Sequence, residues 1–263
     1  MFWGAQTMAE TESEEFLAAA REALEAGRTV EGARLLEALV QREPENALVH
    51  QELATAWVRL ARYGAAVQAA RRALALDPQL ARPHGVLAWV ALNQGRYAEA
   101  EAELGAQLAA LPAEDLGSRA AVYNQLGFLY YRRHRYTEAE GALRRALELD
   151  PDRPIPLLNL ALLALQQGRR SEAQEMLEHL LQQTDLPPEV EHLACFTLGQ
   201  LYARRGRYAD ARAQFARALR IRGTFLGRLY HAAPWLARLS TTALFVLLLI
   251  LFLLLWNLFL RRR

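Results

Sequence analysis

The phrase GRYAEA at residues 95–100 recurs along the chain with small changes, as HRYTEA at 134–139, GRRSEA at 168–173 and GRYADA at 206–211. Each copy follows one run of residues that is compatible with a helix and introduces a second such run. Alternating short helices with a conserved phrase between them indicate a protein built from repeated helical hairpins.

A fixed period accompanies the phrase. Pro44, Pro78 and Pro112 are spaced 34 residues apart, and Pro151 follows after 39 residues. The longer step indicates an insertion of five residues near 115–119. Since proline restricts the residue before it, these prolines mark the ends of helices.

This pattern resembles the tetratricopeptide repeat family. The family has small residues where the two helices of a repeat cross closely, and this chain has Gly32, Ala66, Ala100, Ala139, Ala173 and Ala211 at that position. A second small position holds Ala54, Ala88, Gly127, Ala161 and Gly199, each directly after a leucine. The resemblance lays out six repeats after an N-terminal segment, 1–12, that is disordered or caps them: 13–46, 47–80, 81–114, 120–153, 154–187 and 192–225.

The resemblance implies an all-α fold in which the repeats stack as a solenoid, because no repeat buries its apolar face alone. Gly27, Gly95, Gly168 and Gly206 stand at the turns between paired helices, where glycine adopts a positive φ without steric penalty. His134 takes this place in the fourth repeat, and histidine is among the residues enriched at positive φ.

In this family the first helix of each repeat lines a concave groove. The residues at groove positions form an apolar and aromatic stripe with two amides beside it: Trp89, Leu92, Asn124, Phe128, Tyr131, Leu158, Asn159, Leu162, Leu165 and Phe196. An exposed stripe of this kind marks a binding surface. Two alternatives stay open, namely that residues 1–3 fold back over the stripe or that it is ordinary packing between repeats.

Some relatives clamp the C-terminal carboxylate of chaperones with Lys and Asn side chains. Leu17 and Arg21 stand in the corresponding places of the first repeat, so this clamp is absent. A groove of aromatic residues and leucines favours an apolar segment or an amphipathic helix of a protein partner.

The C-terminal stretch 241–260, TTALFVLLLILFLLLWNLFL, contains no charged residue. A helix of that length spans about 30 Å, the thickness of a bilayer's hydrocarbon core, and Trp256 suits its interface. We therefore expect a transmembrane anchor followed by a polar tail, 261–263. Residues 1–16 are acidic and lack the basic region of a secretory signal, so the repeats are expected in the cytoplasm, at the bacterial inner membrane.

Residues 226–240 place apolar and aromatic side chains at helical spacing on both sides of Pro234. With the aromatics at headgroup depth and the arginines toward anionic lipid, the side chains expected near the membrane are Arg222, Arg228, Tyr230, Trp235 and Arg238. The alternative is a capping helix that packs on the last repeat.

Composition limits the chemistry. The 263 residues carry 31 basic and 29 acidic side chains, and every basic one is arginine. The single cysteine, Cys195, excludes an internal disulfide and a Cys-rich zinc module. Phosphate-binding glycine loops and the common hydrolase motifs are missing, so we expect no enzyme activity, no metal and no cofactor. Anionic lipid rather than nucleic acid is the expected partner of the arginines near the C-terminus.

These features predict a membrane-anchored scaffold that binds proteins through the groove. The alternative is an assembly factor or accessory subunit of a membrane protein complex, in which the transmembrane helix itself makes specific contacts.

Overall fold

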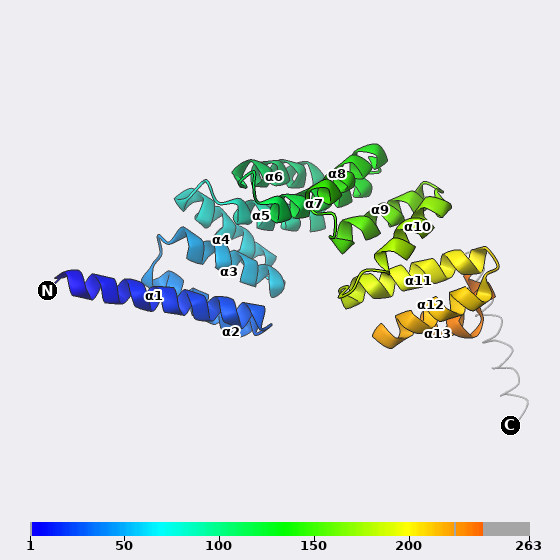
Figure 1. Cartoon of the computed structure of the whole chain (residues 1–263). Helices are drawn as coiled ribbons and strands as arrows, with labels where there is room; N and C mark the ends of the chain where they lie inside the picture. The colour runs from blue at the N-terminus through cyan, green and yellow to red at the C-terminus, as the bar shows by residue number, and fades with distance from the viewer. Residues whose placement is uncertain (1, 224, 239–263) are drawn as a thin grey trace, which may run out of the picture. The chain divides into compact units, whose positions relative to one another are not determined.

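The computed structural model of the chain describes residues 2–223 and 225–238, and every regular element in this part is helical. Consecutive helices pair as hairpins (Figure 1): α1 (Phe2–Glu25) with α2 (Thr29–Arg42), α3 (Ala47–Arg59) with α4 (Tyr63–Leu76), α5 (Ala81–Asn93) with α6 (Tyr97–Ala110), α7 (Leu116–Arg132) with α8 (Tyr136–Leu149), α9 (Pro154–Gln166) with α10 (Arg170–Leu180), and α11 (Pro188–Arg204) with α12 (Tyr208–Ile221). Helix α13 (Phe225–Ala232) and the 3-10 helix η1 (Pro234–Arg238) follow. The predicted all-α solenoid is confirmed.

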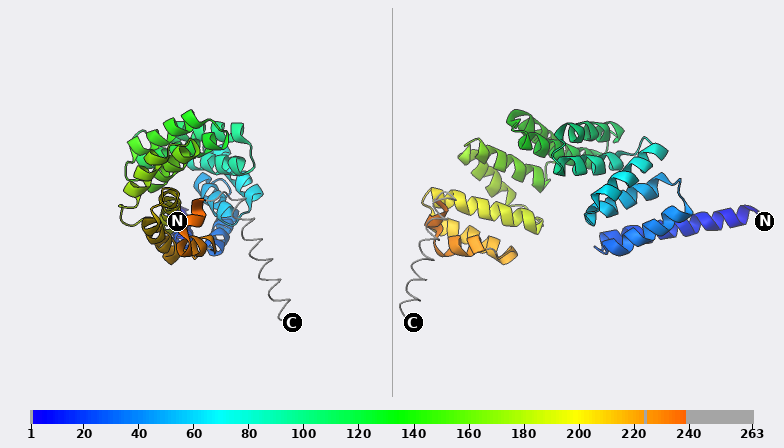
Figure 2. Two further views of the ribbon diagram at one scale, coloured as in Figure 1. Left: turned by 90° about the vertical axis from the view of Figure 1, so that its right-hand side faces the viewer. Right: turned by 180° about the vertical axis from the view of Figure 1, so that it is seen from behind.

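The helices form two compact units, Met1–Pro151 and Asp152–Arg263, called the N-terminal and the C-terminal unit below. Within each unit, neighbouring hairpins lie side by side, as the two further views show (Figure 2). The N-terminal unit buries Leu36, Val49 and Leu129, and the C-terminal unit buries Leu177, Leu198 and Phe215. Each unit therefore has its own apolar core.

Small residues allow the paired helices to approach closely, as predicted. Ala66, Ala139 and Ala211 are completely buried at the crossings. At Gly127, an added Cβ would lie 2.6 Å from Cγ of Leu143 and 3.3 Å from the carbonyl oxygen of Ala139. Hydrogen alone fits between the helices at this position.

Two helices begin earlier than the repeat period suggests. Helix α7 begins at Leu116, where the side chain of Asp115 accepts a hydrogen bond from the backbone N–H of Ser118 at 3.0 Å. This bond satisfies a free N–H at the helix start and lowers the pKa of Asp115. Helix α11 begins at Pro188, whose fixed φ suits the first helical turn. The inserted residues thus lengthen α7.

The turns between paired helices need a left-handed residue. Gly27, Gly95, Gly168 and Gly206 have φ between 74° and 78°, and His134 has φ of 58°, which confirms both predictions. The turn between α3 and α4 has no glycine, and there Ala61 takes the positive φ, 57°. Ala61 lies 34 residues before Gly95. The period alone locates this position, although composition conceals it.

Replacing Ala61 by glycine is expected to stabilise the N-terminal unit. A left-handed residue with a Cβ costs about 1–2 kcal/mol, whereas the added freedom of glycine in the unfolded chain costs about 0.4–1 kcal/mol. Ala61→Gly should therefore raise the free energy of unfolding by about 0.5–1 kcal/mol, measured by urea denaturation.

Ala102, which is exposed on α6, supplies the control. Ala102→Gly should lower the free energy of unfolding by about 1 kcal/mol, because glycine is a poor helix former. A loss of stability at Ala61 as large as that at Ala102 would contradict the assignment of strain to Ala61.

An arginine stands directly before the second helix of each hairpin in the described part. Five of these arginines pair with the acid three residues later: Arg28 with Glu31, Arg96 with Glu99, Arg135 with Glu138, Arg169 with Glu172, and Arg207 with Asp210. The acids lie in the first turn of a helix, where negative charge is favoured by the helix dipole. The recurring phrase GRYAEA thus encodes a turn and an ion pair together.

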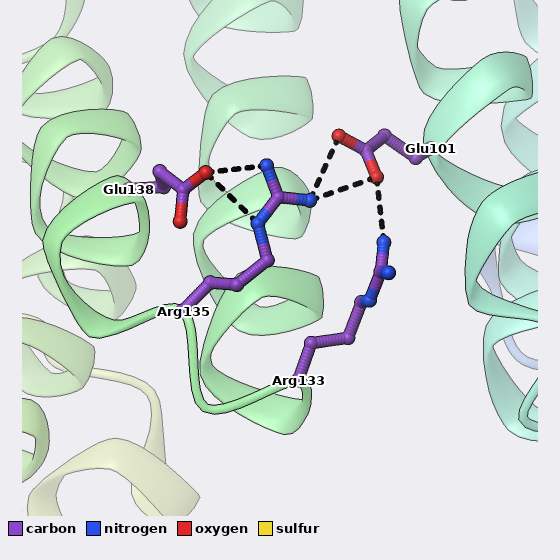
Figure 3. A network of polar contacts seen from close by, with 4 residues as sticks. All are labelled: Glu101, Arg133, Arg135 and Glu138. Carbon is purple, nitrogen blue, oxygen red and sulfur yellow. Dashed lines mark hydrogen bonds and ion pairs between the residues drawn. The ribbon is translucent and has the colours of Figure 1, made fainter.

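The network between α6 and the α7–α8 hairpin extends this pattern (Figure 3). Arg135 bonds Glu138, and it also reaches Glu101 of α6 at 3.1 Å, while Arg133 bonds the same carboxylate at 3.0 Å. The hydrogen bonds from Arg135 lower the pKa of Glu138. The guanidinium of Arg135 also lies 4.5 Å from the ring centre of Tyr130. These contacts join neighbouring hairpins at their turn end.

Candidate functional site

Five of the predicted groove residues lie on α5 and α7 in the N-terminal unit. Leu92 is buried, whereas Trp89, Asn124 and Tyr131 are half-buried and Phe128 is 40% exposed. The ring of Trp89 is 5.3 Å from that of Tyr63, and its indole therefore packs against the start of α4. Phe128 has one aromatic-face contact, with the guanidinium of Arg132 at 5.7 Å. Its apolar surface is open among the residues that the structure describes.

The other five groove residues lie on α9 and α11 in the C-terminal unit. Leu158 is buried, and Leu162, Leu165 and Phe196 pack partly buried against the core of this unit, with Asn159 half-buried beside them. Phe196 lies 5.8 Å from the ring of Tyr230 and 5.7 Å from that of Phe215. In this unit the apolar groove positions thus contribute to packing.

The segment that follows α12 packs on the protein. Tyr230, which was expected near lipid, is buried between Phe196 and Phe215, and burial raises its pKa. Leu236 and Ala237 of η1 are buried in the same core. Trp235 is 52% exposed. Arg222 and Arg228 are also exposed, and Arg238 donates to the Tyr208 hydroxyl at 3.2 Å. An amphipathic sequence suits either a protein or a lipid surface, and here it caps the last hairpin.

The N-terminal unit contains a pocket that the sequence analysis missed. Its volume is about 640 Å³, and it lies between the first helices of three successive hairpins, α1, α3 and α5. The side chains lining it are Arg21, Leu24, Glu25, Gln51, Glu52, Thr55, Arg59 and Arg82. We call it the arginine pocket, after Arg21, Arg59 and Arg82.

A buried carboxylate organises the arginine pocket. Glu52 is 5% exposed, and its Oε1 accepts hydrogen bonds from Nε of Arg21 at 3.1 Å and from Nη1 of Arg82 at 3.3 Å. Arg59 donates to the carbonyl oxygen of Leu24, near the end of α1, at 2.6 Å. A carboxylate with so little access to water needs charged partners, and two arginines supply them.

Sequence spacing held a signal for this pocket. Arg21, Glu52 and Arg82 are separated by 31 and 30 residues, each slightly less than one repeat. Each step therefore shifts the position back by about one helical turn on the next first helix. Searching for charges offset by one turn between neighbouring repeats would have brought the three together.

Comparison with known proteins identifies the family. Tetratricopeptide repeat models match residues 17–81 and 86–154, then 130–194, and finally 192–225. The first of these models alone covers more than half of the chain. The chain belongs to the tetratricopeptide repeat family.

Relatives of this tetratricopeptide repeat protein differ widely in length. Tetratricopeptide repeat protein 17 of Danio rerio is 30% identical over 147 residues, which are 55% of this chain and only 12% of that protein. PilF of Pseudomonas aeruginosa superposes with a TM-score of 0.68 at 19% identity, covering 86% of this chain and 98% of that chain. PilW, a type IV pilus biogenesis factor, gives 0.67 at 18% identity, covering 79% and 92%. These structures share the fold.

The predicted membrane anchor is a correction. Across residues 2–223 and 225–238, no helix is long and apolar enough to cross a membrane. The longest, α1, has 24 residues and carries acids along much of its length. The stretch 241–260, with Trp256, and the tail 261–263 lie outside the described residues. This finding overturns the expected single-pass C-terminal anchor and the membrane location built on it.

The titratable residues outside the groove have structural partners. Cys195 is completely buried, which raises the pKa of its thiol to about 11. The rings of His50 and His192 bond backbone carbonyls, and His84 bonds Glu103 at 2.7 Å. In the described part of the chain, no group of three or more metal-binding side chains is assembled.

Proposed function

We propose that this tetratricopeptide repeat protein is an interaction scaffold that binds an apolar or amphipathic segment of a partner protein along the first helices of its hairpins. The observation that carries the proposal is the 40% exposure of Phe128. Trp89 lies on the preceding hairpin at the corresponding position of its first helix, half-buried.

Aromatic side chains at such positions suit recognition. A phenylalanine ring offers a large apolar area and loses little rotamer freedom on binding, and aromatic residues are enriched among those that dominate binding energy. Asn124 lies one helical turn before Phe128 on α7, where its amide is placed to bond the backbone of a bound segment. Leu92 and Tyr131 would flank the segment.

The C-terminal unit has a different part in this proposal. Leu158, Leu162, Leu165 and Phe196 hold the hairpins together, while Asn159 offers a second amide. We therefore assign the anchoring contacts to the N-terminal unit and expect truncation of Phe128 to matter most.

The test is capture of partners by the tagged full-length chain, quantified by mass spectrometry. Proteins enriched by the wild type should be lost with Phe128→Ala, and more completely with Trp89→Ala and Phe128→Ala together, because two aromatic anchors are then missing. Loss of one anchor should weaken binding by 10-fold or more.

Leu116→Ala is the matched control, since Leu116 is an exposed apolar residue on the same helix, α7. Circular dichroism should show the same helical content in all variants. Identical protein sets captured by the wild type and by the double variant would disprove the proposal.

A further inference from the structure

We propose that the arginine pocket binds carboxylate groups of an acidic protein segment. This site is separate from Phe128 and lies on α1, α3 and α5 of the N-terminal unit (Figure 1). Groove leucines and aromatics had indicated an apolar ligand, and the absence of the Lys and Asn clamp had argued against carboxylates. The pocket reverses that expectation for this part of the groove.

The charges in the pocket do not cancel. Three arginines face two glutamates there, Glu52 and Glu25. Glu52 is buried and already bonded to Arg21 and Arg82, and Glu25 is exposed at the end of α1. Excess positive charge therefore lies at the mouth of the pocket, where it attracts an anion.

Each guanidinium is held in place by part of its donors. Arg21 uses Nε and Nη2 on Glu52, while Arg82 uses Nη1 on the same carboxylate. Arg59 uses Nη1 on the carbonyl oxygen of Leu24. A guanidinium carries five N–H donors in a rigid fork. Several donors on each arginine are therefore left for a ligand.

These remaining donors are accessible. The side chain of Arg21 is 45% exposed and that of Arg82 is 69% exposed. Since Glu52 and the end of α1 already fix the arginines, binding a ligand costs less side-chain ordering than binding to free arginines would. Glu52 thus acts as a positioning residue for the pocket.

A carboxylate matches this arrangement. The planar guanidinium fork pairs with a carboxylate through two parallel hydrogen bonds. The volume of about 640 Å³ accommodates several residues of a peptide, and Gln51 and Thr55 supply further polar groups along it. The carboxylate comes from acidic side chains or from the C-terminus of the segment.

The probe is hexaglutamate labelled with fluorescein at its N-terminus, titrated with the full-length chain at low ionic strength and followed by fluorescence anisotropy. We expect Arg82→Gln to weaken binding at least fivefold. Arg21→Gln combined with Glu52→Gln leaves the net charge unchanged and should also weaken binding at least fivefold, because Arg82 then loses the partner that positions it. Labelled hexaglutamine should not bind.

Arg144→Gln is the control, since it removes the same charge from α8, where Arg144 is exposed and pairs with Glu140. Its affinity should stay within twofold of the wild type. An equal loss with Arg144→Gln, or full affinity with Arg82→Gln, would overturn the proposal. Comparing the amidated peptide with the free acid separates the two sources, because amidation weakens binding only if the C-terminal carboxylate is the group bound. Far-UV circular dichroism verifies that each variant is folded.

Discussion

Replacing Phe215 by alanine is expected to lower the free energy of unfolding of the C-terminal unit by about 3–5 kcal/mol. Phe215 is completely buried, and its ring packs 5.7 Å from Phe196 and 5.4 Å from Tyr230. Its edge also lies where a Cβ on Gly199 would be, at 2.7 Å. Alanine would leave a cavity between α11, α12 and α13, which these aromatic neighbours are too rigid to fill.

Cys195 provides the measurement. It is the only cysteine of the chain, it is completely buried on α11, and its raised pKa of about 11 leaves it protonated at neutral pH. A thiol reagent therefore modifies it only when the unit opens. Since about 1.4 kcal/mol corresponds to a factor of ten, Phe215→Ala should accelerate the reaction at least 100-fold.

The control is Phe128→Ala, the same substitution at an exposed site in the N-terminal unit. It should leave the reaction rate of Cys195 unchanged. A rate within threefold of the wild type for Phe215→Ala would show that the aromatic cluster is not what holds the C-terminal unit closed.

The architecture was predictable because its geometry excludes substitution. Helices that cross closely need a small residue, so Ala66, Ala100 and Gly127 recur at fixed spacing and show the period. Left-handed turns similarly select glycine, and His134 could be placed from the repeated phrase around it. Ala61 was missed because the search was for glycine rather than for the position.

The candidate site was less predictable. Whether a residue on a first helix faces the groove or the next hairpin depends on helix rotation, and Leu92 and Leu158 are buried although the pattern places them with Phe128. The arginine pocket depends on three hairpins at once. An amphipathic segment such as 226–240 has the same sequence pattern whether it covers protein or lipid, and only its contacts through Tyr230 decide between them.

The close helix crossing predicts opposite effects for one substitution at two glycines. In an open helix position, Gly→Ala stabilises by about 1 kcal/mol. Gly141 on α8 is such a position, because an added Cβ would meet no atom within 4 Å. At Gly127, the new Cβ would lie 2.6 Å from Cγ and 2.7 Å from Cδ2 of Leu143, which is itself buried. Overpacking of this kind costs about 1–3 kcal/mol.

Gly141→Ala should therefore slow hydrogen exchange of the α7 and α8 amides, and Gly127→Ala should accelerate it, with the two variants differing by about 2–4 kcal/mol in opening free energy. Leu143→Ala tests the cause, since the clash disappears with the leucine side chain. The two substitutions together should then cost less than the sum of their separate effects. Additive losses would mean that the helices separate at Gly127 for a reason other than contact with Leu143, and the small residues would no longer explain the period.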